Sequence, residues 1–187
     1  MYNPSPIIDA YLGLAQKRTS PSSGNTYCFM CELFTHLDRS TTPHQEFEAF
    51  LKSNHDDVPE LSRLDKIIFP IEQGGHFMLI VADMRQRRLS LVDSLTSYKG
   101  VQREKCLNLV RSMLLHYEYI KRLDWGIKHF EVHPMKVPQQ TNGFDCGVFA
   151  CIAARSIMDG LKLVHGQQHM PAYRRLMCWQ LLNGSLD

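Results

Sequence analysis

The chain has 187 residues, of which 44% are hydrophobic and 21% are charged, and its formal net charge is +2. These values are ordinary for a soluble globular protein, and the length suits one domain with a sizeable core. The small net charge predicts no large surface for nucleic acid. No apolar run approaches the roughly 20 residues that cross a bilayer, and the N-terminus lacks the pattern of a signal peptide.

The first seventy residues predict two helices and one short strand. Apolar residues at helical spacing place one helix over 7–15 and a second over 45–52. A segment rich in turn-forming residues, 18–25, follows the first helix. Residues 26–37 are apolar without a clear period. The β-rich run 66–70 indicates a strand that its proline ends.

The middle of the chain predicts a hairpin, a helix and a strand. The nearly continuous apolar run 76–83 is typical of a strand buried on both faces. A second strand over 88–93 would pair with it antiparallel. The connecting RQRR run at 85–88 is most often a solvated hairpin tip; the alternative is contact with acidic patches on a partner. Helical spacing marks 102–121, and alternation marks 128–137 as a strand leading into a loop.

Two helices complete the predicted order of elements. Residues 146–158 are apolar almost all round, which favours a helix buried in the core, with Gly160 as its C-terminal cap. Pro171 suits the first turn of a final helix that ends at Gly184. The order of elements predicts one α+β domain over 1–187, a mainly antiparallel sheet with helices packed on it.

The six cysteines mostly lie inside apolar segments, which predicts reduced, buried thiols and a nuclear or cytoplasmic location. Cys28 and Cys31, with His36 and His44 downstream, admit a zinc or redox interpretation. Their spacing fits no strong zinc template, and the apolar neighbours favour core packing. No metal or cofactor is therefore expected. Three further cysteines on apolar helix faces are predicted to be core residues: Cys106, Cys151 and Cys178.

Cys146 differs because a loop runs into a helix at this point. With Asp145 near the N-cap, the sulfur sits in the first helical turn, where free N–H groups and the helix dipole favour a thiolate. Gly147 leaves space for a substrate beside it. A buried structural cysteine is the alternative for this residue taken alone. A thiolate at a helix N-terminus is a nucleophile.

A nucleophilic cysteine needs a histidine as its base and an acceptor that orients the histidine. His76 opens one predicted strand and Asp93 closes its partner, so an antiparallel hairpin brings the two together. His129 and His133 are spare candidates for the base. Gln140 is expected to donate to an oxyanion together with the Cys146 N–H. Gln139 is its competitor for that role.

These residues stand in segments that resemble one known family. The run PQQTNGFDCGVF resembles the catalytic-cysteine motif of the SUMO (sentrin) proteases, within the wider family of ubiquitin-like-protein-specific cysteine proteases. GGHFMLIVAD resembles their histidine strand and LSLVDSL their Asp-Ser-Leu motif, in the family's order and spacing. The resemblance covers about residues 6–182.

The resemblance implies a papain-like fold whose central helix carries the nucleophile. It further implies cleavage after the C-terminal Gly-Gly of a ubiquitin-like modifier, most often SUMO, from a lysine conjugate or a precursor. Cys146 would be the nucleophile, His76 the base and then the acid, Asp93 the orienting group and Gln140 the oxyanion donor.

Two departures concern the tunnel that holds the Gly-Gly tail in the family. Phe77 stands where the family usually has Trp, and a phenyl ring roofs a tunnel with less area. The family's Trp-Leu-Asn-Asp motif before the first helix is replaced by Tyr2-Asn3-Pro4-Ser5. Tyr2, Phe77 and Gly147 are therefore the expected tunnel residues. A monomer is expected, with the modifier and its conjugates as partners.

The sequence leaves three alternatives open. One is a protease for ubiquitin or another ubiquitin-like modifier. A second is an acetyltransferase on the same scaffold, although nothing in the sequence indicates an acetyl-CoA or inositol phosphate site. A third is an inactive modifier-binding module, which the altered N-terminal motif motivates and the candidate triad opposes.

Overall fold

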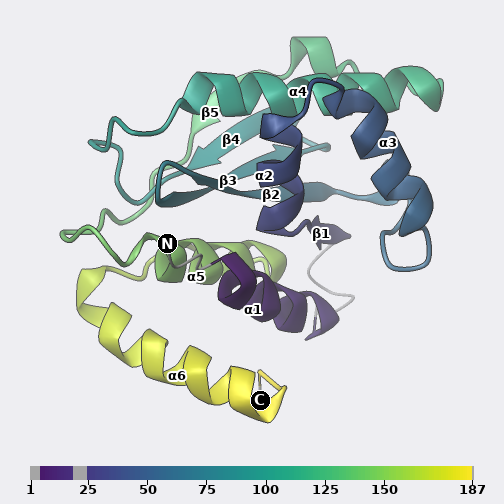
Figure 1. Ribbon diagram of the computed structural model, residues 1–187. Helices are drawn as coiled ribbons and strands as arrows, with labels where there is room; N and C mark the ends of the chain where they lie inside the picture. The colour runs from purple at the N-terminus through teal and green to yellow at the C-terminus, as the bar shows by residue number, and fades with distance from the viewer. Residues whose placement is uncertain (1–4, 19–24, 187) are drawn as a thin grey trace.

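The computed structural model describes residues 5–18 and 25–186 as a sheet of five strands with helices on both faces (Figure 1). The elements are, in chain order, α1 (Ser5–Arg18), β1 (Thr26–Cys28), α2 (Cys31–Arg39), α3 (Pro43–Ser53), β2 (Lys66–Gln73), β3 (His76–Asp83), β4 (Arg88–Val92), α4 (Arg103–Ile120), β5 (Glu131–Pro134), α5 (Cys146–Met158) and α6 (Met170–Asn183).

The sheet has the strand order β1-β2-β3-β4-β5. Its two long central ladders are antiparallel, whereas β1 and β5 join the edges as parallel strands. The α+β class and the central antiparallel hairpin are therefore confirmed. The strand predicted over 128–137 is confirmed as β5, whereas β1, with three residues, has too few side chains to show a pattern. The parallel direction of both edge strands was not predicted, because alternation along a strand does not reveal the direction of its neighbour.

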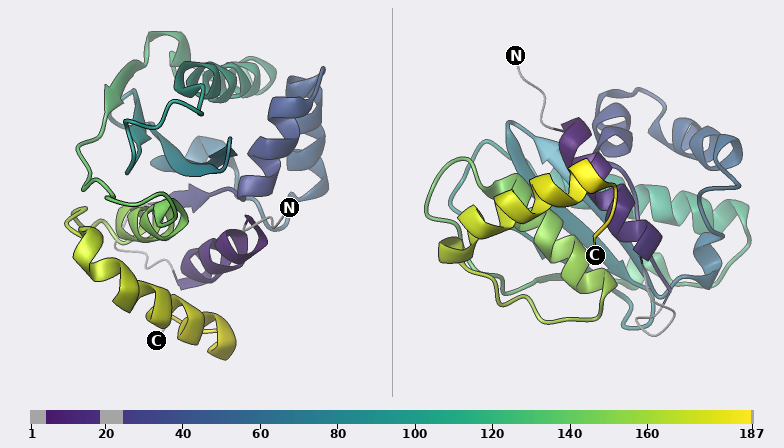
Figure 2. Two further views of the ribbon diagram at one scale, coloured as in Figure 1. Left: turned by 60° about the vertical axis from the view of Figure 1, so that its left-hand side comes forward. Right: turned by 90° about the horizontal axis from the view of Figure 1, so that it is seen from below.

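Strand β3 separates two hydrophobic clusters, since its side chains alternate between the two faces of the sheet. Phe77, Leu79 and Val81 pack into the cluster formed with α1, α5 and α6. Met78 and Ile80 pack into the cluster that includes α3 and α4. The view from below shows α1, α5 and α6 together under the sheet (Figure 2). Burial on both faces, as predicted for 76–83, is confirmed.

The prediction that Pro70 ends its strand is wrong, because β2 continues to Gln73. Counted from the Gln73–His76 pair beside the turn, Pro70 falls at a position that forms no hydrogen bonds to β3. At this position a backbone N–H group would point away from β3, toward the side of β2 where β1 lies. Because β1 has already ended at Cys28, which pairs with Ile68, that N–H group would have no strand to bond to. A proline therefore removes no ladder bond here.

The other helix predictions are confirmed as α1, α3, α4, α5 and α6, and the ambiguous run 26–37 resolves into β1 and α2. Gly160 and Gly184 both follow helices in the left-handed conformation. Most of the predicted turn segment 18–25 lies outside the described residues. Within the ranges given above, no helix has the length and apolarity needed to cross a membrane.

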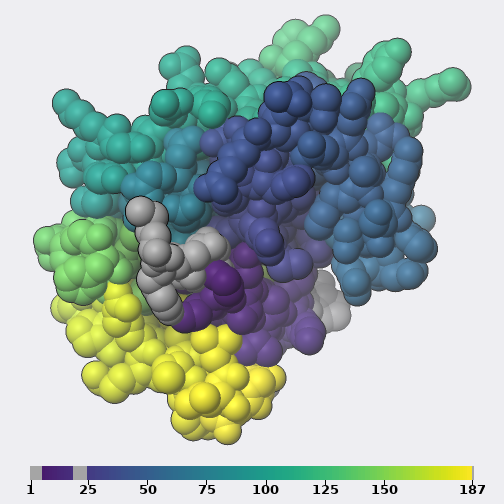
Figure 3. Space-filling view, in the orientation of Figure 1, coloured from purple at the N-terminus to yellow at the C-terminus, as the bar shows by residue number. Residues whose placement is uncertain are grey.

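The prediction that Cys178 is a core residue is wrong, because its side chain is exposed. Helix α6 buries only the stripe that contains Met170, Met177 and Gln180. Cys178 follows Met177 by one residue and so lies about 100° around the helix from the buried stripe. In the space-filling view α6 (yellow) forms the lower edge of the molecule, below α1 (Figure 3).

Gly74 shapes the turn that places His76 at the start of β3. Its φ of +64° is left-handed, and a Cβ at this position would lie 2.5 Å from the carbonyl oxygen of Gly100. We expect Gly74→Ala to reduce the free energy of unfolding by ~2 kcal/mol or more. Urea denaturation measures this loss.

Gly13→Ala is the matched control, because Gly13 is helical and has open space around its Cβ position. The free energy of unfolding of this variant should rise by roughly 0.5–1 kcal/mol. Unfolding midpoints that are equal for Gly74→Ala and the parent protein would contradict the proposed strain at the turn.

Candidate active site

His76 and Asp93 meet at one end of the β3–β4 hairpin. His76 is the first residue of β3, and Asp93 directly follows β4, whose last residue, Val92, pairs with Leu79. The His76 Nε2 atom lies 2.8 Å from Asp93 Oδ1, and both side chains are only 2% exposed. The hairpin therefore brings His76 and Asp93 into contact, as their positions at the ends of the two strands predicted.

Asp93 accepts two further hydrogen bonds that hold its carboxylate in place. Oδ1 accepts from the Leu95 N–H at 2.8 Å, and Oδ2 accepts from Arg103 Nε at 2.7 Å. Burial opposes ionisation of this carboxyl, but the hydrogen bonds from His76, Leu95 and Arg103 outweigh it and hold its pKa below the usual value. Asp93 thus both caps the turn at Ser94 and orients His76.

Arg103 is a site residue that the sequence did not reveal. It stands at the start of α4 and also donates to the carbonyl oxygens of Leu95 and Tyr98, at 3.0 and 2.7 Å. One guanidinium therefore joins the carboxylate to the loop that carries it. An arginine in the first turn of an amphipathic helix is common, so no sequence signal could distinguish it.

Cys146 is the first residue of α5 and lies within hydrogen-bonding contact of His76. Burial alone would raise its pKa. The hydrogen bond to His76, the N–H groups of Phe77 and Gly147, and the charge of His76 together lower it below the usual value for a thiol. This combination stabilises a thiolate.

The pKa of His76 shifts in the opposite direction to that of Cys146. Burial alone would lower its pKa, but the hydrogen bonds to Asp93 and Cys146 and the charges of both groups raise the pKa of His76 to about 9. Asp93 occupies Nε2, which leaves Nδ1 for the sulfur. The two shifts describe a buried imidazolium–thiolate pair.

The other buried thiols behave in the opposite way, since burial raises the pKa of each of them. For Cys106 the pKa rises to about 11. Burial also raises the pKa of Cys28, Cys31 and Cys151. The environments of these thiols lack a cationic partner strong enough to oppose the effect of burial. Position at the start of α5 beside His76 therefore distinguishes Cys146 from these core thiols.

Asp145 occupies the N-cap position of α5, yet its side chain makes no capping bond. Oδ1 accepts instead from Arg174 Nε at 2.7 Å, and Oδ2 accepts from Asn142 Nδ2 at 2.7 Å and Gln167 Nε2 at 2.6 Å. Burial opposes ionisation, but these three partners hold the pKa of Asp145 below its usual value. The first N–H groups of α5 therefore remain available to the Cys146 sulfur and to a developing oxyanion.

Gln167 connects the two segments on which the chemistry depends. Its Oε1 accepts from the Thr141 N–H at 2.8 Å, next to Gln140, while its Nε2 donates to Asp145, next to Cys146. Gln167 follows α5 and precedes α6. The sequence did not identify Gln167 or Arg174, because their roles depend on where α6 packs.

Gln140 is buried between two anchors. Its Oε1 accepts from the Ser94 hydroxyl at 2.8 Å, and its Nε2 donates to the Asn142 carbonyl oxygen at 2.6 Å. Since an amide nitrogen carries two N–H groups, one is left after this bond. Gln139 instead donates to the Asp93 carbonyl and accepts from Thr96.

An open groove of about 690 Å³ runs beside Cys146. Phe77 lines it from β3 and is buried, with 4% of its surface exposed. A Cβ on Gly147 would lie 2.9 Å from Ile8 Cδ1 and 3.6 Å from Phe77 Cδ2, so only glycine fits without displacing Ile8. Tyr2, the other predicted tunnel residue, lies outside the described residues. The remaining lining is mostly apolar: Ile7, Gly75, Gly143, Phe144, Val148, Arg174, Met177, Cys178, Leu181 and Leu182.

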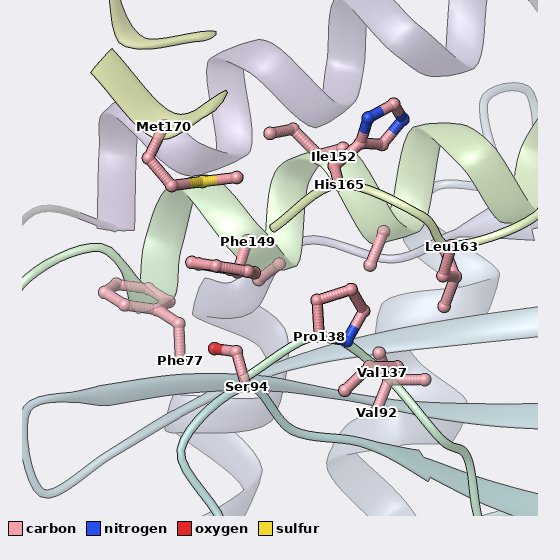
Figure 4. Close-up of a pocket in the computed structure, with 12 residues that line it drawn as sticks. Phe77, Val92, Ser94, Val137, Pro138, Phe149, Ile152, Leu163, His165 and Met170 are labelled. Carbon is pink, nitrogen blue, oxygen red and sulfur yellow. The ribbon is translucent and has the colours of Figure 1, made fainter. Parts of the chain in front are cut away.

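A second, much smaller cavity of about 30 Å³ lies behind the groove. In the close-up, Phe77 extends from β3 and Phe149 from α5, with Pro138 on the loop that leads to Gln140 (Figure 4). This volume is close to that of one water molecule. Cys146 does not line it, so we assign this cavity to packing between α5 and the Gln140 loop.

The spare candidates from the sequence do not reach the site. His129 and His133 are exposed near β5, and His133 contacts Glu131 at 2.8 Å. His36 contacts Glu46, at 2.8 Å. In the part of the chain that the structure covers, no group of three or more His, Cys, Asp or Glu side chains is arranged to hold a metal ion.

Comparisons with known proteins point to one family. The model of the "Ulp1 protease family, C-terminal catalytic domain" matches residues 4–180. Human Sentrin-specific protease 2 is 31% identical over 126 residues, which is 64% of this chain and 20% of that protein. The Arabidopsis thaliana ubiquitin-like-specific protease ESD4 is 31% identical over 129 residues, covering 66% and 25%. The chain thus spans only about a fifth to a quarter of the length of these two relatives.

Solved structures share the fold. The yeast Ulp1 protease domain in complex with Smt3 aligns with a TM-score of 0.81 and 23% identity, over 98% of this chain and 77% of that one. The Xanthomonas campestris effector XopD bound to ubiquitin aligns with a TM-score of 0.58 and 21% identity, over 97% and 90%. The predicted cysteine-protease fold, with a central helix on the sheet, is confirmed.

The contact between His76 and Cys146 predicts how the thiol reacts with iodoacetamide. In a Cys178→Ser background, which removes the exposed thiol, His76→Gln should raise the pKa of Cys146 and slow its alkylation at pH 7. Each unit of pKa difference slows labelling by about tenfold. The difference should shrink only at pH values well above 9, because burial raises the pKa of Cys146 above the usual value for a thiol once His76 is replaced. Mass spectrometry follows the labelled residue.

His133→Gln is the control, since this exposed histidine lies on β5 and not at the site. It should leave the labelling rate unchanged at every pH. An unchanged profile in His76→Gln would show that His76 does not stabilise the thiolate.

Proposed function

This chain belongs to the Ulp1 protease family, C-terminal catalytic domain, and on that premise we propose that it is a thiol isopeptidase or peptidase. It would cut after the C-terminal Gly-Gly of a ubiquitin-like modifier. The observation that supports this most strongly is the buried His76, held by Asp93 at 2.8 Å and in contact with a Cys146 whose pKa is lowered.

In the proposed first step the Cys146 thiolate attacks the carbonyl carbon of the last glycine. The carbonyl π electrons move to oxygen and form a tetrahedral oxyanion. The free N–H of the Gln140 amide and the backbone N–H of Cys146 would donate to this oxygen, and one such donor is typically worth ~3 kcal/mol. The open first turn of α5 adds its dipole.

In the second step the oxyanion collapses and the C–N bond breaks. The His76 imidazolium gives its proton to the departing lysine or backbone amine, leaving a thioester on Cys146. Neutral His76 then takes a proton from water, whose oxygen attacks the thioester. Collapse of this second intermediate releases the modifier carboxylate and restores the thiolate and imidazolium. Asp93 orients His76 throughout.

SUMO is the modifier that we propose first. Human Sentrin-specific protease 2 carries this specificity in its name, and the yeast Ulp1 domain was solved with Smt3, the yeast ortholog of SUMO. Ubiquitin is the second candidate, because the XopD effector of the same fold binds it. The partners would be the modifier and the proteins that carry it.

We also propose that residues 1–187 form one catalytic domain that acts as a monomer in the nucleus or cytoplasm, without nucleic acid or a cofactor. Two observations support a reducing compartment. The five buried thiols are free cysteines, and the nucleophile itself must stay reduced to react. The triad needs no metal, since His76 supplies the base.

The two rivals from other classes are less well supported. An acetyltransferase would require a site for acetyl-CoA, and the groove beside Cys146 is mostly apolar with Arg174 as its cation, which already binds Asp145. A passive modifier-binding module would not need a lowered thiol pKa at Cys146 or a paired His76.

Electrophilic probes made from modifier C-termini test the nucleophile and the modifier together. We expect covalent labelling of Cys146 by the SUMO probe, visible as a mass shift, and slower or no labelling by the ubiquitin probe. Cys146→Ala should abolish turnover of a fluorogenic SUMO substrate while retaining SUMO binding.

Folded protein that no modifier probe labels would overturn the proposed activity. Faster labelling by ubiquitin would overturn the choice of SUMO alone. Transfer of radiolabelled acetyl from acetyl-CoA to protein would favour the acetyltransferase instead.

Adjacent glutamines provide a matched test of the oxyanion donor. Gln140→Leu should lower kcat by roughly 10²–10³-fold with little change in KM, since the lost bond exists only in the transition state. Gln139→Leu should lower kcat far less, because the Gln139 amide contacts Asp93 and Thr96 and not the reacting carbonyl. Steady-state kinetics on a fluorogenic substrate measures both. Equal losses in kcat would assign Gln140 a structural role.

A further inference from the structure

A second groove, of about 460 Å³, lies at the end of the sheet opposite Cys146. Its walls are the end of β3, the start of β4, the segment after β5 and the chain that follows α5. Strand β3 runs from His76 at the active end to Asp83 in this groove. Its eight residues separate the two sites by roughly 25 Å.

The groove carries an excess of positive charge. Lys66, Arg88, Lys136 and Lys162 line it, and within residues 5–18 and 25–186 their side chains form no ion pair or hydrogen bond. Asp83 is the carboxylate among the lining residues. These four cations are therefore available to acidic groups of a partner.

Arg88 is the most informative of the four cations. It pairs across the sheet with Asp83, yet no ion pair forms between them. Its Nε atom is buried without a hydrogen-bond partner among the described residues. A buried donor without an acceptor is unfavourable, so the Arg88 side chain would gain by turning this atom toward a carboxylate in the groove.

Apolar side chains stand beside these charges. Leu161 and Val164 are 64% and 66% exposed, and both line the groove on the segment that follows α5. Met135 lines it from the segment after β5. Cations alternating with exposed apolar side chains around a groove suit a ligand that carries both carboxylates and apolar groups.

We propose that this groove binds an extended acidic segment of a partner protein, with apolar side chains between its carboxylates. The occupant is a peptide and not a nucleic acid, because Asp83 and the apolar rim would repel or fail to contact a continuous phosphate backbone. The proposal goes beyond the catalytic function, since the groove lies at the other end of β3. Both sites can be occupied together.

The test uses a fluorescein-labelled 12-residue peptide that alternates Glu with Leu, and a twin in which Gln replaces every Glu. Fluorescence anisotropy on the intact chain should show at least roughly tenfold tighter binding of the Glu peptide, weakening as salt rises. Lys136→Glu with Lys162→Glu should remove this preference.

Lys99→Glu with Arg175→Glu is the matched control. It makes the same change in net charge at the active end, where Lys99 precedes Gly100 and Arg175 follows Arg174. This variant should retain binding of the Glu peptide. The groove variant should keep the Cys146 alkylation rate of the parent, which also reports an intact fold.

Several outcomes would overturn the proposal. One is equal affinity for the Glu and Gln peptides. Another is equal loss of binding in the groove variant and in its control, which would indicate net charge alone. Competition by single-stranded DNA as effective as that by unlabelled Glu peptide would indicate a general polyanion surface. None of these results bears on the catalytic activity.

Discussion

The hydrogen bond between His76 and Asp93 is the interaction on which the arrangement of the site depends. A buried imidazolium is stable only beside a buried anion, and Asp93 is held ionised by Leu95 and Arg103 as well as by His76. The cation in turn favours the thiolate of Cys146. Without the hairpin that joins His76 to Asp93, Cys146 would resemble the inert thiols of the core.

Asp145 illustrates how local preference yields to tertiary structure. Its sequence position predicts a helix cap, whereas its carboxylate binds Arg174 and Gln167. A capping carboxylate at the start of α5 would place a second negative charge beside the Cys146 sulfur and would occupy the N–H groups that favour the thiolate. The observed orientation avoids both effects.

The parts of the fold that the sequence predicted are those with a long repeating pattern. β3, α4 and α5 have enough residues to display a period, and alternation marked the segment that holds β5, whereas β1 has only three residues. The predictions for Pro70 and Cys178 were wrong because both depend on neighbours in space. These neighbours decide whether a strand can continue through a proline and whether a helical cysteine is buried. At the site, His76, Asp93 and Cys146 were identifiable from hairpin geometry and motif. Residues that hold them, such as Arg103 and Gln167, come from elements whose packing no local pattern encodes.

The dependence of Asp145 on α6 has a consequence for synthesis on the ribosome. Gln167 and Arg174 follow Asp145 by 22 and 29 residues. Because chains emerge from the N-terminus, His76, Asp93 and Cys146 are synthesised before Gln167 and Arg174, which are two of the three partners of Asp145. The nascent chain therefore carries its nucleophile before it carries two of the groups that turn Asp145 away from the sulfur, and the surroundings of the thiolate are complete only once the segment of Gln167 and α6 has packed.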